Sequence, residues 1–238
     1  MNKTAFTILA VVAAALLSFG LYSAMTAPSI YVAAASTAKE AEFSEIFRIF
    51  YYHVPSAWTA FLLFFANFIA SVAFLVKRKP GADAFALATA EVGVVFCTVV
   101  LVTGPIWAKP VWGIWWTWDA RLTTTLVLWL IYISYLLLRR YSTGGQTPVI
   151  AAALAVFGFV DVPLVYMSIR WFRTQHPQPV IAGDPGSGIA PPMMHALLIN
   201  FAAFVVFSIL LVWLRYTMER MRTEIEERHA WAAVGSPR

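Results

Sequence analysis

Six long apolar runs constrain the fold of this chain more than any other feature of its sequence. Each run is nearly free of charge and, at about 18 residues or more, is long enough to cross a bilayer as a helix. Only 12% of the 238 residues are charged, against about 25% in soluble domains. The sequence therefore predicts an all-α integral membrane protein, a six-helix bundle in one domain over residues 1–238. The runs cover roughly residues 5–25, 58–76, 86–106, 122–138, 148–168 and 195–214.

The first run has a second interpretation. A positive charge at Lys3, an apolar stretch and small residues near Ala27 are also typical of a secretory signal peptide. The apolar stretch of about 20 residues exceeds the usual ~7–15 of such a signal, which favours a retained span. Both interpretations place the segment that follows on the outer side.

Basic residues predict the orientation, because Lys and Arg near span ends are retained in the cytoplasm. With the N-terminus inside, the inner segments carry eleven basic residues and the outer segments six. We therefore expect both termini in the cytoplasm and short amphipathic segments on the outer side. The inner set is Lys3, Lys77, Arg78, Lys79, Arg139, Arg140, Arg215, Arg220, Arg222, Arg228 and Arg238, and the outer set is Lys39, Arg48, Lys109, Arg121, Arg170 and Arg173.

Two motifs that the sequence lacks narrow the function. Without a GxxxxGK[ST] phosphate loop we expect no ATP hydrolysis by this chain. Without CxxCH we expect no covalent c-type haem on it. The single Cys97 lies inside the third run and is expected to pack as a small apolar residue. The net charge of +5 follows from the inner basic residues, and we expect no nucleic-acid partner.

The stretch KPVWGIWWTWDARLTTT, residues 109–125, separates the third and fourth runs. Five of the ten tryptophans fall within residues 107–118. Tryptophan is enriched at membrane surfaces, which would account for one or two of them. We predict that residues 107–121 form an aromatic docking loop on the outer side, with a simple aromatic belt as the alternative.

Two of the four histidines share the outer side with this loop. Apolar residues recur at helical spacing from Phe43 to Val54, which predicts a short amphipathic helix on the membrane surface. This helix would bring His53 to the mouth of the second span. His176 follows the fifth span in the segment SIRWFRTQHPQP. His195 is expected to be a surface or packing residue, and His229 lies in the cytoplasmic tail.

Two imidazoles, an aromatic platform and nearby cations together meet the needs of haem. Neutral histidine supplies axial nitrogen to haem iron, and the flat macrocycle gains by stacking on indole rings. The two propionates suit arginine, which forms paired charge-assisted hydrogen bonds. The cations on the expected side are Arg48, Lys109, Arg121 and Arg173.

Other functions remain open from the residues alone. Glu91 and Asp161 lie within spans with no evident partner, where ionisable groups are functional candidates; a transporter of another solute or ion would use them. A membrane b-type cytochrome is a further alternative, but it would need histidines paired inside the spans. Asp119 has a structural alternative as the cap of the fourth span or the partner of Arg121.

The stretch WGIWWTWDARLT closely resembles the signature W-G-x-W-W-x-W-D of the WWD-domain proteins that handle haem in cytochrome c maturation. The chain length and six runs are similar to the short members of that group, the haem exporter protein C (CcmC) type, rather than to the longer members that join haem to apocytochrome. The fixed positions correspond to Trp112, Gly113, Trp115, Trp116, Trp118 and Asp119.

The resemblance extends to two histidine segments, FRIFYYHVPSAW and VDVPLVYMSIRWFRTQHP. It implies that His53 and His176 are axial ligands of non-covalent haem b, carried as transient cargo, and that the signature residues bind the macrocycle. A propionate role for Arg121 is our inference from its charge and side. The resemblance implies no catalytic residue and therefore no enzyme.

The resemblance also implies a place of action and partners. The expected function is haem binding at the outer face of the bacterial inner membrane and haem delivery to a periplasmic chaperone, the E subunit of the same system. A small single-span D subunit and an ABC transporter made of A and B subunits are the other expected partners. ATP hydrolysis would then come from a separate chain.

Overall fold

The computed structural model describes residues 3–27, 45–177, 179 and 189–235. Within these residues all regular secondary structure is helical, and six helical segments are long and apolar enough to cross a membrane. The predicted all-α six-helix membrane bundle is therefore confirmed. The helices are α1 (Lys3–Thr26), η1 (Phe47–Ile49) running into α3 (Phe50–Lys77), α4 (Pro80–Trp112), α5 (Ala120–Tyr141), α6 (Thr147–Phe159), α7 (Asp161–Trp171) and α8 (Pro191–Gly235).

The helices extend beyond the predicted runs, most of all on the outer side. The second crossing begins at Phe47 instead of near residue 58, so the expected amphipathic segment is continuous with α3; its Phe43 lies outside the described residues. The predicted loop 107–121 is wrong at both ends, because α4 continues to Trp112 and α5 begins at Ala120. The apolar runs predict only the part of each helix that lies in the hydrocarbon of the membrane. The backbone hydrogen bonds of the helix can continue beyond that part into more polar sequence.

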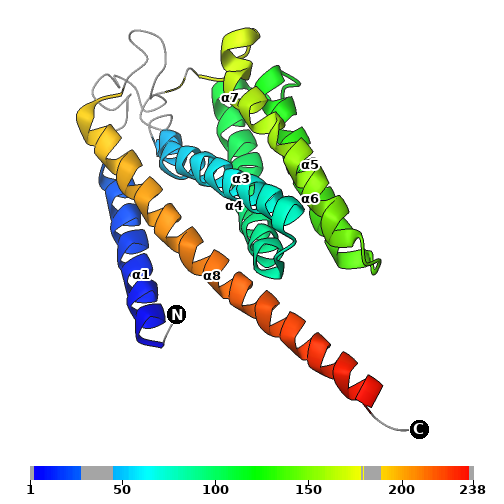
Figure 1. Cartoon of the computed structure of the whole chain (residues 1–238). Helices are drawn as coiled ribbons and strands as arrows, with labels where there is room; N and C mark the ends of the chain where they lie inside the picture. The colour runs from blue at the N-terminus through cyan, green and yellow to red at the C-terminus, as the bar shows by residue number, and fades with distance from the viewer. Residues whose placement is uncertain (1–2, 28–44, 178, 180–188, 236–238) are drawn as a thin grey trace, which may run out of the picture.

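The bundle has three groups of helices. α1 packs on α8 at one side, α5 packs on α6 and α7 at the other, and the closely paired α3 and α4 lie between them. Figure 1 shows both termini on the same side of the bundle, with α8 reaching well beyond the other helices. Asn200 of α8 donates a hydrogen bond to the carbonyl of Gly20 at 3.0 Å, which holds α1 close to α8.

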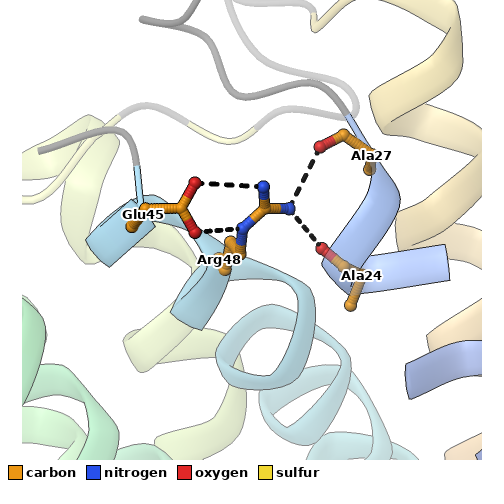
Figure 2. A network of polar contacts seen from close by, with 4 residues as sticks. All are labelled: Ala24, Ala27, Glu45 and Arg48. Atoms are coloured by element: carbon orange, nitrogen blue, oxygen red, sulfur yellow. Dashed lines mark hydrogen bonds and ion pairs between the residues drawn. The ribbon is translucent and has the colours of Figure 1, made fainter. Parts of the chain in front are cut away.

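Arg48 ties the start of the second crossing to the end of α1. Its guanidinium donates to the carboxylate of Glu45 at 2.7 and 3.2 Å and to the carbonyls of Ala24 and Ala27 at 2.9 and 3.2 Å (Figure 2). The last carbonyls of a helix lack partners within the helix and attract cations. Arg48 therefore closes the C-terminal end of α1, and the surface pair with Glu45 is only part of its role.

Two ion pairs connect the helices on the side of the termini. Arg139 at the end of α5 donates to both carboxylate oxygens of Asp83 on α4, at 2.6 and 2.8 Å. Arg215 of α8 forms a similar two-bond pair with Glu91 of α4. The expectation that Glu91 has no partner is therefore wrong, because α8 stays helical beyond residue 214 and brings Arg215 beside α4.

Asp161 is the other acid within the spans. It begins α7 after the interruption at Val160 and is buried. One of its carboxyl oxygens, Oδ2, has no hydrogen-bond partner among the described residues. The ion pair with Arg215 argues against a transport path that would use both Glu91 and Asp161.

Candidate functional site

One cavity of about 640 Å³ lies among α3, α4, α5, α7, α8 and the segment after α7. This volume is within the range of sites for small molecules and cofactors. The predicted site residues His53, His176, Trp112, Trp116 and Arg121 all line it. The fold thus brings His53 and His176 into one cavity, although 123 positions separate them in the sequence.

His53 projects from the first turn of α3. Its Nδ1 lies 2.8 Å from the hydroxyl of Thr103 on α4, and that hydroxyl lies 2.7 Å from the carbonyl of Val99. Because Thr103 donates its proton to Val99, its oxygen accepts from His53, which assigns the proton of the imidazole to Nδ1. The Nε2 atom of His53 therefore keeps its lone pair. Gly104 lies beside the ring, where a Cβ would make an ordinary contact of 3.4 Å with Cε1 of His53.

His176 reaches the same cavity from the segment after α7. Its Nδ1 lies 2.9 Å from the carbonyl oxygen of Pro177. A carbonyl only accepts, so Nδ1 carries the proton and Nε2 again keeps its lone pair. Burial, together with the nearby charge of Arg121, lowers the pKa of His176 to about 4. The side chain is therefore neutral at physiological pH, the form in which histidine binds a metal.

The Trp-rich segment turns sharply between two capped helix ends. Gly113 ends α4 in the left-handed region, with φ of 79°, and its N–H donates to the carbonyl of Lys109 at 3.0 Å. A positive φ of this kind favours glycine. Asp119 caps α5 by accepting a hydrogen bond from the N–H of Leu122 at 3.0 Å, and Thr117 donates to its other oxygen at 3.2 Å. Gly113 and Asp119 thus shape the turn, and neither lines the cavity.

The signature tryptophans divide into two groups. Trp112 and Trp116 line the cavity, as does Trp107 at the end of α4, whose ring meets that of Trp112 edge to face at 5.3 Å. Trp115 and Trp118 are 58% and 75% exposed and lie outside the cavity lining. The predicted aromatic platform is therefore only partly formed by the residues of the signature.

The comparisons with known proteins identify the family of the chain. The family model described as "Heme exporter protein C" matches residues 1–233.

The chain belongs to the heme exporter protein C family.

Several curated relatives carry the same or a related name. Heme exporter protein C of Bradyrhizobium diazoefficiens is 33% identical over 214 residues, which cover 90% of this chain and 76% of that protein. Heme exporter protein C of Escherichia coli K12 is 32% identical over 191 residues, 79% of this chain and 75% of the relative. A putative cytochrome c biosynthesis ccmC-like mitochondrial protein of Marchantia polymorpha is 34% identical over 180 residues, 76% of each chain. The resemblance seen in the signature is thus confirmed.

In this member of the family, Arg121 supplies the charge of the cavity wall. It sits in the first turn of α5, and its Nη1 donates to the carbonyl of Val165 on α7 at 2.6 Å. Among the described residues no carboxylate forms an ion pair with Arg121. Asp119 is near enough to act on its charge but forms no ion pair with it, and a partly buried cation of this kind favours an anionic ligand. The other expected cations do not line the cavity: Lys109 binds the Gly113 carbonyl at 3.0 Å, Arg173 is exposed, and Arg48 binds α1.

Sequence reasoning missed most of the apolar wall. Phe50, Trp58 and Phe61 of α3, Tyr166 of α7 and Phe201 of α8 all line the cavity. The signal for α3 was present, since these aromatic residues continue the helical spacing of the preceding amphipathic segment. His195 and His229 are exposed, and His195 does not line the cavity.

Proposed function

We propose that this chain binds haem at the outer face of the membrane and delivers it to a periplasmic haem chaperone for the biogenesis of c-type cytochromes. Membership of the heme exporter protein C family supports haem handling. The basic-residue count supports placing the cavity on the outer side. As a handling subunit the protein is not an enzyme, and haem b is its non-covalent cargo.

The observation that carries the proposal is the matched state of the two histidines. His53 and His176 line one cavity, and each has its Nδ1 proton engaged and its Nε2 free. A hydrogen bond at one ring nitrogen fixes the ring and raises the basicity of the other, as is usual for metal-ligating histidines. In the proposed complex the two Nε2 atoms are the axial ligands of the haem iron.

The rest of the cavity suits the rest of the haem. Indole rings at Trp112 and Trp116 offer faces or edges for a flat macrocycle. The guanidinium of Arg121 lines the cavity, where a propionate would form the direct ion pair that no described carboxylate makes with it. The other signature residues do not contact the haem in this proposal. Gly113 and Asp119 shape the turn, and the exposed rings of Trp115 and Trp118 form the outer surface that meets the chaperone.

We propose the bacterial inner membrane as the location and the Ccm system as the setting. The proposed partners are the periplasmic chaperone, or E subunit, the single-span D subunit, and an ABC transporter of A and B subunits. This chain would then supply the haem site, while the transporter hydrolyses ATP. Release to the chaperone would require that both histidines leave the iron. The two histidines belong to separate segments, α3 and the chain after α7, so that one could leave before the other.

The test is haem binding by purified protein and its dependence on the two histidines. Wild-type protein is expected to bind haem with a low-spin, two-histidine absorption spectrum. His53→Ala and His176→Ala are each expected to lower the haem content or convert the spectrum to a high-spin form. His195→Ala is the matched control, since His195 is exposed and off the cavity. Normal spectra in both cavity variants would refute the proposed ligation.

Delivery is tested separately by co-purification with the chaperone. At matched expression, wild-type protein is expected to yield haem-loaded chaperone, and the two histidine variants chaperone with little haem. A Trp115→Ala and Trp118→Ala double variant changes no residue that lines the cavity, although it removes the edge-to-face contact of Trp118 with Trp116 at 5.7 Å. It is expected to bind haem and to lose the chaperone; unchanged recovery of loaded chaperone would contradict the surface role.

A further inference from the structure

A second, smaller hollow of about 300 Å³ adjoins the main cavity on the side of α3 that lies between α7 and α8. Four aromatic residues, Trp58, Phe61, Tyr166 and Phe201, line both spaces. The two hollows therefore adjoin at these four residues. No charged residue lines the smaller one, in contrast to the cavity with its Arg121.

The smaller hollow faces the lipid. Leu62 and Phe65 line it without lining the cavity, and they are 48% and 49% exposed. Within a membrane span, exposed apolar side chains of this kind meet acyl chains. α7 packs on α5 and α6, and its contact with α8 is at most slight in the described part of the chain. The hollow thus lies on α3 where α7 and α8 do not pack closely on each other.

Aromatic side chains of neighbouring helices contact each other across this gap. Trp58 of α3 meets Phe201 of α8 edge to face at 5.2 Å, and Phe65 of α3 meets Phe159 at 5.7 Å. Side chains change rotamer far faster than helices move. A passage here would open by rotation of a few rings, with the helices in place.

The chemistry of the gap fits one cargo. We propose that haem dissolved in the bilayer enters the cavity sideways through this gap. The macrocycle passes between Trp58, Phe201 and Tyr166, which offer aromatic surface and no unpaired charge. The guanidinium of Arg170 lies 5.3 Å from the ring centre of Tyr166 and Arg121 lines the cavity beyond, so cations stand where the propionates arrive. A lipid acyl chain carries no anionic group that would bind those cations.

The proposal rests on the proposed function, and the experiment separates the two. Wild-type protein and variants are reconstituted in vesicles, and the rate of haem uptake from haem-loaded donor vesicles is followed by absorbance. Leu62→Trp fills the hollow without touching the cavity, and Phe65→Ala widens it. We expect the first to slow uptake at least fivefold and the second to leave it equal or faster. The final spectrum should be that of wild-type protein in both.

Ile69→Trp is the matched control, because Ile69 is an equally exposed residue of α3 two turns beyond Leu62 and outside the hollow. Its uptake rate is expected to equal that of wild-type protein. A second arm adds haem to protein in detergent, where no bilayer route exists, and there Leu62→Trp should load at the wild-type rate. Equal vesicle uptake by Leu62→Trp and Ile69→Trp overturns the lateral route, as does an equal slowing of Leu62→Trp in detergent. Wild-type protein that loads in detergent but not from vesicles likewise overturns the lateral route, whereas failure of wild-type protein to bind haem in both arms would overturn the proposed function.

Discussion

The Nδ1 atom of His53 lies 2.8 Å from Oγ1 of Thr103, which itself donates to the carbonyl of Val99. This chain of two hydrogen bonds fixes both the orientation and the tautomer of the imidazole from a neighbouring helix. The same tautomer is imposed on His176 by a backbone carbonyl. Two different local devices thus produce one matched pair of nitrogen lone pairs in one cavity.

The first prediction concerns Thr103. Thr103→Val keeps the shape of the side chain but removes the acceptor, so the ring of His53 is no longer held. Loss of such a supporting hydrogen bond typically weakens a metal site about 10–100-fold. Haem titration is expected to show a drop of this size, with recovery in Thr103→Ser. Thr124→Val, which removes a hydroxyl bound only to backbone carbonyls of its own helix, should bind haem normally.

The second prediction concerns pH. Burial, and then the charge of Arg121, lowers the pKa of His176 to about 4 from an ordinary 6.5. Below about pH 6.5 the imidazole of His176 is protonated in the unfolded chain but stays neutral in the folded chain. This difference does not affect the free energy of unfolding above about pH 6.5. It lowers that free energy increasingly as the pH falls toward 4. The thermal midpoint of haem-free protein should fall over this window, and less so in His176→Gln. An identical fall in that variant would assign the effect elsewhere.

The third prediction separates the cavity from an aromatic belt. Trp116 lines the cavity, while its neighbour Trp115 is exposed. Stacking on an aromatic ring contributes about 0.5–1.5 kcal/mol beyond area burial, and each ~1.4 kcal/mol is a factor of ten in affinity. Trp116→Leu should therefore weaken haem binding about two- to tenfold, measured by competition with a haem-binding protein, and Trp115→Leu should leave it unchanged. Equal effects of the two substitutions would favour the belt.

The sequence predicts the membrane class and the pairing of His53 with His176 because both depend on local composition and on which side a segment emerges. It fails where a property depends on the third dimension. The roles of Trp112 and Trp116 against Trp115 and Trp118 follow from the turn at Gly113, whose direction no periodicity specifies. The apolar wall from α3 and α8 requires knowing which helices pack together.

The fourth prediction tests the orientation, which rests on the basic residues alone. Gly144→Cys lies in the turn between α5 and α6, and Trp118→Cys lies in the exposed Trp-rich segment. In intact cells a membrane-impermeant thiol reagent should label the second and spare the first. The native Cys97 is buried and should give no background. Labelling of Gly144→Cys alone would show the opposite orientation, with the cavity on the cytoplasmic side.

The last prediction concerns the pair of Glu91 and Arg215, and it decides whether Glu91 is structural or a transport residue. The two side chains are 29% and 33% exposed, so the cost of breaking the pair should be below the ~3–5 kcal/mol of a fully buried pair. We expect Glu91→Gln to lower stability by about 1–3 kcal/mol, because Arg215 is left without its counter-charge. Replacing both residues, Glu91→Gln with Arg215→Gln, should recover most of that loss in a thermal unfolding assay. Haem binding should stay normal in both variants, since the pair lies on the side of the termini and does not line the cavity. A stable double variant that had lost haem delivery while still binding haem would instead place Glu91 in the transport machinery.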